Sequence, residues 1–223
     1  MSLVGIKPFI VEGVLYRNME IHDIHAAAEC FANSFQREPM VQSLGITAGE
    51  FMPFAEQCCE QATQDGMGLV AVDELTNKIA GFTILQDALA EMPEDIFVNH
   101  RNMLPIFEIL EQLQNKYIAE KELTQQGEVV VSFVTGVNEE YQGTKIAFFL
   151  FGQSLELAKS KGYKNKITLV TGRLSQNGVR RRYSFTPYAS VFYHDFQFEG
   201  KHVFKSIDDK NLSCVLMEKC LLN

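Results

Sequence analysis

The sequence lacks the features that mark several classes of protein. It has no internal repeat, no low-complexity tract and no Pro/Gly/Ser-rich linker among its 223 residues, so we expect a single domain over residues 1–223. No apolar run approaches the roughly 18–20 residues that a membrane-spanning helix needs. The stretch from Met1 to Tyr16 has no basic patch followed by an apolar core, so a secretory signal is not expected either.

Cysteine and basic residues are also scarce. The five cysteines, an odd number, fit reduced thiols in a cytoplasmic protein better than a disulfide framework. No pair of them has the two-residue spacing of zinc ligands, so we expect no metal. Twenty Lys and Arg against 28 Asp and Glu give a net charge of −8. Nucleic-acid-binding proteins are more often basic, so no nucleic-acid or membrane partner is expected, and the negative field favours a cationic small molecule.

The hydrophobic pattern alternates between helical and strand spacing. Thr47 followed by Glu50 has the spacing of a capping box and predicts the start of a helix. The pattern predicts helices over residues 19–35, 47–62, 100–117, 146–161 and 175–183, and strands over 9–15, 68–72, 79–85, 128–137, 166–171, 188–198 and 212–217. We therefore expect an α+β (mixed α/β) fold, with a central twisted mixed sheet of about seven strands and helices on both faces.

The most informative segment is a strand, a turn and a helix between residues 129 and 157. The turn reads Tyr141-Gln142-Gly143-Thr144-Lys145-Ile146-Ala147, and the helix starts inside it. The first amides of a helix have no partner within the helix, and the helix dipole favours an anion there. Gly143 lets the backbone approach a phosphate without an intervening Cβ. The pattern predicts a diphosphate-binding turn.

At this turn the sequence resembles the GNAT superfamily of acyl-CoA-dependent N-acetyltransferases. Gln142 matches the first position of the superfamily's fingerprint and Ala147 its last, whereas Lys145 stands where the family usually has glycine. A narrower resemblance, to the arylalkylamine (dopamine-type) N-acetyltransferases, covers most of the chain. It is carried by the segments 31–45 with its Glu38-Pro39 pair, 65–73, 79–81, the helix around 100–113, and 193–204.

The resemblance implies a GNAT-like fold and an acetyl-CoA-dependent transfer of an acetyl group to a small primary amine, an arylalkylamine or a polyamine, by direct attack in a ternary complex. By the same resemblance, backbone amides around Gly136 and Val137 stabilise the oxyanion and pair with the pantetheine arm. The cofactor-binding set that follows is Gly136, Val137, Gln142, Gly143, Thr144, Lys145 and Ala147.

Glu38 matches the catalytic glutamate of these enzymes. An alkylammonium has a pKa near the ~10.4 of lysine, so it must lose a proton before it attacks a thioester, and Glu38 is the candidate base. Thr171 and Ser175 fall on the two hydroxyl positions of a proton relay, although the register at Ser175 depends on how the segment is aligned. Phe35, one helical turn before Glu38, is the candidate wall of the amine pocket.

Other interpretations remain open at this stage. Glu38 taken alone reads as a solvated loop glutamate, and the run Arg180 to Arg182 reads either as a solvated helix face or as a contact to the ribose phosphate. Arg180 also occupies the place of the tyrosine that protonates the leaving thiolate in many GNAT enzymes. Together with Lys145 it favours the main alternative, an acyl-CoA-binding module that has lost turnover. Acetylation of a peptide N-terminus or lysine is a third reading, and a monomer and a dimer both remain open.

Overall fold

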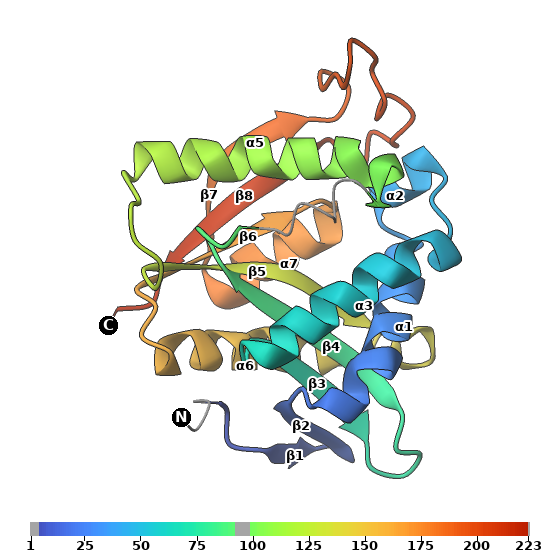
Figure 1. Ribbon diagram of the computed structural model, residues 1–223, viewed down its shortest axis with the longest axis vertical. Helices are drawn as coiled ribbons and strands as arrows, with labels where there is room; N and C mark the ends of the chain where they lie inside the picture. The colour runs from blue at the N-terminus through green and yellow to red at the C-terminus, as the bar shows by residue number, and fades with distance from the viewer. Residues whose placement is uncertain (1–4, 92–98, 223) are drawn as a thin grey trace. The chain divides into compact units, whose positions relative to one another are not determined.

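The computed structural model describes residues 5–91 and 99–222 and contains one mixed sheet of eight strands in the order β1-β2-β3-β4-β5-β6-β8-β7 (Figure 1). The strands are β1 Phe9–Val11, β2 Val14–Asn18, β3 Gly68–Asp73, β4 Ile79–Asp87, β5 Val129–Val137, β6 Asn165–Val170, β7 Thr186–Phe192 and β8 Ser213–Cys220. The predicted fold class is confirmed, with one strand more than expected.

The helices alternate with these strands along the chain. They are α1 Ile24–Phe35, α2 Pro39–Leu44, α3 Ala48–Gln64, α5 Leu104–Glu120, α6 Ile146–Ser160 and α7 Arg173–Tyr183, with short 3-10 turns at η1 Ile21–Asp23, η2 Arg101–Met103 and η3 Glu139–Tyr141. Within the described ranges, none of these helices is both long and apolar enough to cross a bilayer.

The additional strand comes from a tight turn in the first apolar run. The sequence predicted one strand over residues 9–15, but β1 and β2 form an antiparallel hairpin in which Val11 is paired with Val14. Glu12 and Gly13 make the turn with φ angles of 54° and 77°. Two consecutive positive φ angles are typical of a two-residue hairpin turn. Such turns usually contain Asn, Asp or Gly, so the glutamate at position 12 did not indicate a turn in the sequence.

The chain divides into two compact units. The first contains the described residues up to Phe35 together with 47–86 and 132–164, and the second contains 36–46, 87–131 and 165–222. Strand β5 contributes residues to both.

In the first unit, helices cover both faces of the sheet. The ring of Phe82 on β4 lies 5.1 Å from that of Phe31 on α1. Its neighbour Gly81 faces α6, since a Cβ there would lie 2.9 Å from Ile146 and 3.0 Å from Leu150. Successive strand residues point to opposite faces, so α1 and α6 lie on opposite sides, as Figure 1 also shows.

Two helix starts in the 38–50 region follow from capping residues. The predicted capping box is confirmed, because Glu50 N donates to Thr47 Oγ1 (3.3 Å) and Thr47 N donates to Glu50 Oε2 (2.9 Å) at the start of α3. The Glu38-Pro39 pair was expected only to follow the end of the first helix. It instead begins α2, with Glu38 as N-cap and Pro39 at the first helical position, where its missing N–H costs nothing.

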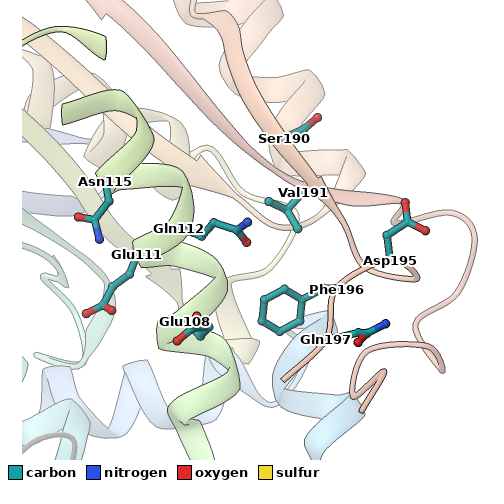
Figure 2. Close-up of a pocket in the computed structure, with 9 residues that line it drawn as sticks. All are labelled: Glu108, Glu111, Gln112, Asn115, Ser190, Val191, Asp195, Phe196 and Gln197. Atoms are coloured by element: carbon teal, nitrogen blue, oxygen red, sulfur yellow. The ribbon is translucent and has the colours of Figure 1, made fainter. Parts of the chain in front are cut away.

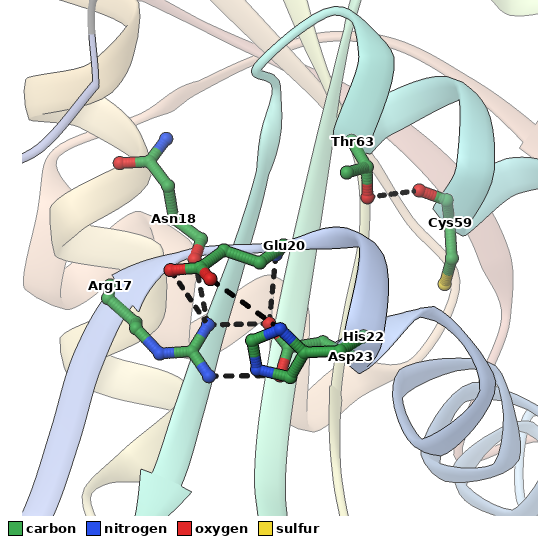
Figure 3. A network of polar contacts seen from close by, with 7 residues as sticks. All are labelled: Arg17, Asn18, Glu20, His22, Asp23, Cys59 and Thr63. Carbon is green, nitrogen blue, oxygen red and sulfur yellow. Dashed lines mark hydrogen bonds and ion pairs between the residues drawn. The ribbon is translucent and has the colours of Figure 1, made fainter.

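A buried ion pair fixes the entry into α1 (Figure 3). Arg17 Nη2 donates to Asp23 Oδ1 at 2.9 Å, and Glu20 N donates to Asp23 Oδ2 at 2.8 Å. Burial alone would raise the pKa of Asp23, but the hydrogen bonds from Arg17 and from the Glu20 amide hold it below its usual value. The ionised pair therefore anchors η1 to strand β2.

The second unit is built on the antiparallel strands β6, β8 and β7. Helix α5 packs on this part of the sheet, where the Tyr117 hydroxyl donates to Glu218 Oε2 at 3.1 Å. Strand β7 ends at Phe192, short of the predicted limit at residue 198, because the chain turns there and the amides of Asp195 and Phe196 donate to the Phe192 carbonyl.

Candidate active site

The predicted diphosphate turn lies in the first unit, between η3 and α6. Gly143 has a φ of 77° and open space where a Cβ would stand, which suits close approach of a ligand to the backbone. The Thr144 hydroxyl donates to the Tyr141 carbonyl at 2.6 Å and accepts a long 3.4 Å bond from the Ile146 amide. Among the described residues, no hydrogen bond involves the amides of Gly143, Lys145 or Ala147. The Thr144 side chain thus occupies the Ile146 amide and leaves those three backbone amides open to a ligand.

Polar contacts brace this turn against two neighbouring hairpins. The Tyr141 hydroxyl donates to Asp73 Oδ2 at 2.9 Å, and Lys78 Nζ lies 3.1 Å from the Glu140 carboxylate. Lys145 Nζ lies 3.1 Å from Glu12 Oε1, and both side chains are well exposed. Exposed ion pairs contribute little to stability, so Lys145 exchanges Glu12 for another anion at small cost.

The predicted oxyanion position, at the end of β5, is tightly packed. A Cβ on Gly136 would lie 2.4 Å from the Phe82 ring and 2.5 Å from Ser34 Oγ, so only glycine fits there. Val137 follows as the last residue of β5 and is half-buried. The predicted amine-pocket residue Phe35 belongs to the same unit, in edge contact with Phe31 at 4.7 Å between ring centroids.

Glu38 lies in the second unit and has an unusual environment. Its Oε2 accepts the Val41 amide at 2.8 Å, as an N-cap does. Its Oε1 is buried and has no hydrogen-bond partner in the part of the chain that the structure describes. Burial raises the pKa of Glu38 above its ordinary value, although the Val41 amide, the Thr171 hydroxyl and the Met40 amide act in the opposite direction. A raised pKa and an unpartnered oxygen are properties of a proton acceptor at work near neutral pH.

The two predicted relay hydroxyls differ in their positions. Thr171, which follows β6, lies close enough to Glu38 to affect its pKa. The Ser175 hydroxyl donates to the Gly172 carbonyl at 2.7 Å in the first turn of α7, and Ser175 is exposed. The structure thus brings Thr171 to Glu38, while no contact among the described residues joins Ser175 to it. The role of Ser175 stays a prediction.

Sequence reasoning gave no role to two residues beside Glu38. The Tyr193 hydroxyl donates to the Thr171 carbonyl at 2.7 Å, and the charge of Glu38 acts on both Tyr193 and Cys214. Burial raises the pKa of the Tyr193 phenol and of the Cys214 thiol. Tyr193 stands in the Tyr-His-Asp-Phe segment that carries part of the family resemblance, which was the available signal. Cys214 gave none.

A separate cavity of about 560 Å³ lies in the second unit between α5 and the segment around β7 (Figure 2). Carboxylates and carboxamides predominate in its lining, and none of the predicted site residues takes part. The lining residues are Glu108, Glu111, Gln112, Asn115, Ser190, Val191, Asp195, Phe196 and Gln197. Burial and the charge of Glu108 raise the pKa of Glu111.

The arginines of α7 and the possible metal ligands remain to be placed. Arg180 and Arg181 are exposed on α7, which agrees with a solvated helix face. Within residues 5–91 and 99–222, no three His, Cys, Asp or Glu side chains gather in an arrangement that would hold a metal ion.

Comparison with known proteins supports the fold through structure alone. No family model matches the chain, and no curated protein matches it by sequence. The C-terminal condensation domain of Ebony, solved with beta-alanyl-dopamine, is similar with a TM-score of 0.83 and 18% identity, over 93% of this chain and 98% of that one. Arylalkylamine N-acetyltransferase 2 from Aedes aegypti is similar with a TM-score of 0.79 and 19% identity, over 95% of this chain and 100% of that one.

The polyamine N-acetyltransferase of Drosophila melanogaster, which forms N-acetylagmatine, gives a TM-score of 0.69 at 12% identity, over 93% of this chain and 99% of that one. Likeness at such low identity establishes a fold and leaves the chemistry to the site residues. The chain therefore has the same fold as these N-acetyltransferases, as its motifs predicted.

Proposed function

We propose that this protein is an acetyl-CoA-dependent N-acetyltransferase that acts on a small primary amine. The observation that carries the proposal is the half-buried Glu38, whose pKa is raised and whose buried Oε1 has no hydrogen-bond partner among residues 5–91 and 99–222. An unpaired buried polar atom costs roughly 1–3 kcal/mol, and such a cost is retained where the atom has a ligand to meet. A substrate ammonium offers the N–H donor that this oxygen lacks.

Glu38 acts as the general base in this proposal. The ammonium form of the amine transfers a proton to the carboxylate, either directly or through the Thr171 hydroxyl beside it. The neutral nitrogen then attacks the thioester carbonyl and the new C–N bond forms. The C–S bond breaks to release the thiolate, and the extra proton that the nitrogen gained on attack passes to the departing sulfur, which leaves the neutral amide and the thiol of CoA. A thiol with a pKa near 8.5 leaves without a dedicated acid, so Arg180 in place of a tyrosine does not prevent the reaction.

The turn from Tyr141 to Ala147 supplies the complementary part, namely recognition of the thioester carrier. The amides of Gly143, Lys145 and Ala147, which no described residue bonds, lie at the N-terminus of α6 and are suited to the diphosphate of CoA. The tightly packed Gly136 and the adjoining Val137 are the proposed source of the backbone donors for the developing oxyanion. We also propose that residues 1–223 act as a single catalytic domain.

The proposed substrate class follows from charge and from the neighbours. The net charge of −8 attracts cationic amines. Proteins of the same fold include an arylalkylamine N-acetyltransferase and an enzyme that forms N-acetylagmatine. The phenylalanines around Phe35 would suit an arylalkylamine, so dopamine-type amines, agmatine and polyamines form the first panel to test.

Thiol release from acetyl-CoA with this panel is the direct test. We expect Glu38→Gln to lower kcat by about 100-fold or more, the contribution typical of a general base, and to leave the Kd for acetyl-CoA unchanged. Glu60→Gln on the exposed face of α3 is the matched control and should behave as wild type. Unchanged turnover in Glu38→Gln would refute the assigned base.

Binding measurements separate an enzyme from a module without turnover. If acetyl-CoA binds but no amine releases CoA, the acyl-CoA-binding alternative holds. β-Alanyl-CoA belongs in the same assay, because the Ebony domain was solved with a β-alanyl amine.

The diphosphate turn has its own test. Gly143→Val places a β-branched residue at a positive φ, and we expect acetyl-CoA affinity to fall by about 10-fold to 100-fold through lost charge-assisted hydrogen bonds. Acetyl-pantetheine lacks the diphosphate and should be used equally well by variant and wild type. An equal loss with both donors would contradict this role of the turn.

A further inference from the structure

We propose that Tyr193 is a positioning residue that holds the Thr171 hydroxyl against Glu38, an inference that rests on the proposed function. The Tyr193 side chain is fully buried, and its hydroxyl donates to the Thr171 carbonyl at 2.7 Å. A buried phenol needs a hydrogen-bond partner, and here the partner is backbone at the residue that adjoins the proposed base.

The place of Thr171 in the sheet explains why such a tie matters. The pairing of β6 with β8 ends at Val170, which is opposite Val215, so Thr171 lies just beyond the ladder. Its backbone therefore lies outside the β6–β8 pairing. Since carbonyl and side chain are attached to the same Cα, the bond from Tyr193 restricts the peptide orientation and hence the direction of the Thr171 hydroxyl.

The same segment is also tied to the helix that carries Glu38. The Tyr193 ring makes edge contact with Phe204 at 6.0 Å between centroids, and the neighbouring Val203 carbonyl accepts a 3.0 Å hydrogen bond from Ser43 Oγ. Ser43 belongs to α2, which begins at Glu38. These contacts link α2 through Ser43 to Phe204, Tyr193 and Thr171, and the Thr171 hydroxyl in turn influences the pKa of Glu38. The segment 193–204 therefore contacts both α2, which begins at Glu38, and Thr171.

The groups that face Glu38 allow a shift in its pKa to be assigned to one cause. Tyr193 and Cys214 are the ionisable neighbours, and burial raises the pKa of both, so both are neutral near pH 7. The other groups that bear on the carboxyl are the Thr171 hydroxyl and the amides of Val41 and Met40. A shift in the pKa of Glu38 on loss of the Tyr193 hydroxyl therefore reports a change in hydrogen bonding rather than in charge.

The experiment compares Tyr193→Phe, Thr171→Val and the double variant. Kinetics give kcat and KM, and ¹³C NMR of carboxyl-labelled glutamate, assigned with Glu38→Gln, gives the pKa of Glu38. We expect Tyr193→Phe to lower kcat about tenfold with the KM for acetyl-CoA unchanged, and to raise the pKa of Glu38. In the Thr171→Val background it should change neither quantity further, because it acts through that hydroxyl.

Tyr188→Phe is the matched control. Its hydroxyl, on β7, donates to Glu120 and not to the base, so kcat and the pKa of Glu38 should stay at the wild-type values. Additive effects of Tyr193→Phe and Thr171→Val, or an unchanged pKa of Glu38 in Tyr193→Phe, would overturn the proposal. If Tyr193→Phe does not fold, Ser43→Ala breaks the same series of contacts at α2 and must show the same lack of additivity with Thr171→Val.

The pKa of Glu38 tests the positioning role of Tyr193, and acetyl transfer tests the proposed function, so either proposal can be refuted without the other. A shifted pKa in a protein that transfers no acetyl group would support the positioning role and refute the proposed function. Acetyl transfer by the wild-type protein, together with an unchanged pKa of Glu38 in Tyr193→Phe, would support the proposed function and refute the positioning role.

Discussion

Replacement of Glu38 by glutamine should make the protein less active and, above neutral pH, more stable. The folded-state pKa of Glu38 lies above its ordinary value because of burial, so the folded protein holds this proton more tightly than the unfolded chain. The resulting stability is fully present below the unfolded pKa and is lost as the pH rises through the folded pKa. Glutamine cannot ionise, so Glu38→Gln avoids that loss.

The size of the gain follows from the surroundings of the carboxyl. Above its pKa, wild type buries a charged oxygen, Oε1, that has no hydrogen-bond partner among the described residues, and a buried unsatisfied group costs roughly 1–3 kcal/mol. The glutamine oxygen still accepts the Val41 amide, although a weaker cap offsets part of the gain. We expect a net increase of about 1 kcal/mol in the free energy of unfolding at pH 8–9, or roughly 2–4 °C in Tm.

Thermal and urea unfolding of Glu38→Gln and wild type between pH 5 and 9 measure this difference. The two stability curves should converge as the pH falls and separate as it rises, with Glu60→Gln parallel to wild type throughout. A variant that is less stable than wild type at pH 9 would show that the carboxylate is well solvated in the folded protein. The explanation of the raised pKa by burial would then be wrong.

Three further substitutions test the packing and capping around the site. Gly136→Ala forces a Cβ into space held by a neighbouring ring and should lower the free energy of unfolding by about 1–3 kcal/mol in urea titrations, whereas Gly172→Ala meets only ordinary contacts and should cost little. Asp23→Asn leaves Arg17 in a largely buried place without the Asp23 carboxylate, and a loss of about 3 kcal/mol is expected. The difference should shrink as the pH falls through the lowered pKa of Asp23, because wild-type Asp23 then also loses its charge. Thr47→Ala removes a helix cap and should cost about 1 kcal/mol by thermal unfolding; no change would show that the cap is dispensable.

Local rules were sufficient for several elements whose partners are close in sequence. The capping box at Thr47 and Glu50 joins residues three apart, so the sequence contains both of its members. The strand, turn and helix from Val129 to Ser160 were likewise predicted from period and turn residues, and the structure agrees within about one residue at each limit. The turn at Glu12 and Gly13 was missed because only one of its two residues is a typical turn residue.

Local rules could not predict the surroundings of Glu38. The motif around Glu38-Pro39 suggested a base, yet nothing local shows that Oε1 is buried without a partner. That property depends on Thr171, Tyr193 and Cys214, which lie more than 130 residues further along the chain. The same holds for Gly136 on β5, where only glycine fits because of Phe82 on β4 and Ser34 on α1.

By itself, the amino-acid sequence determined most of the order of helices and strands, the capped start of α3, and the strand, turn and helix around Gly143. Hydrogen bonds and side-chain periods within a few residues decide these features. Only the tertiary structure decided the protonation behaviour of Glu38, the pairing of Tyr193 with Thr171 and the turning of Lys145 toward Glu12. Those features depend on burial and on charges brought close by folding, and neither quantity is a property of a short stretch of chain.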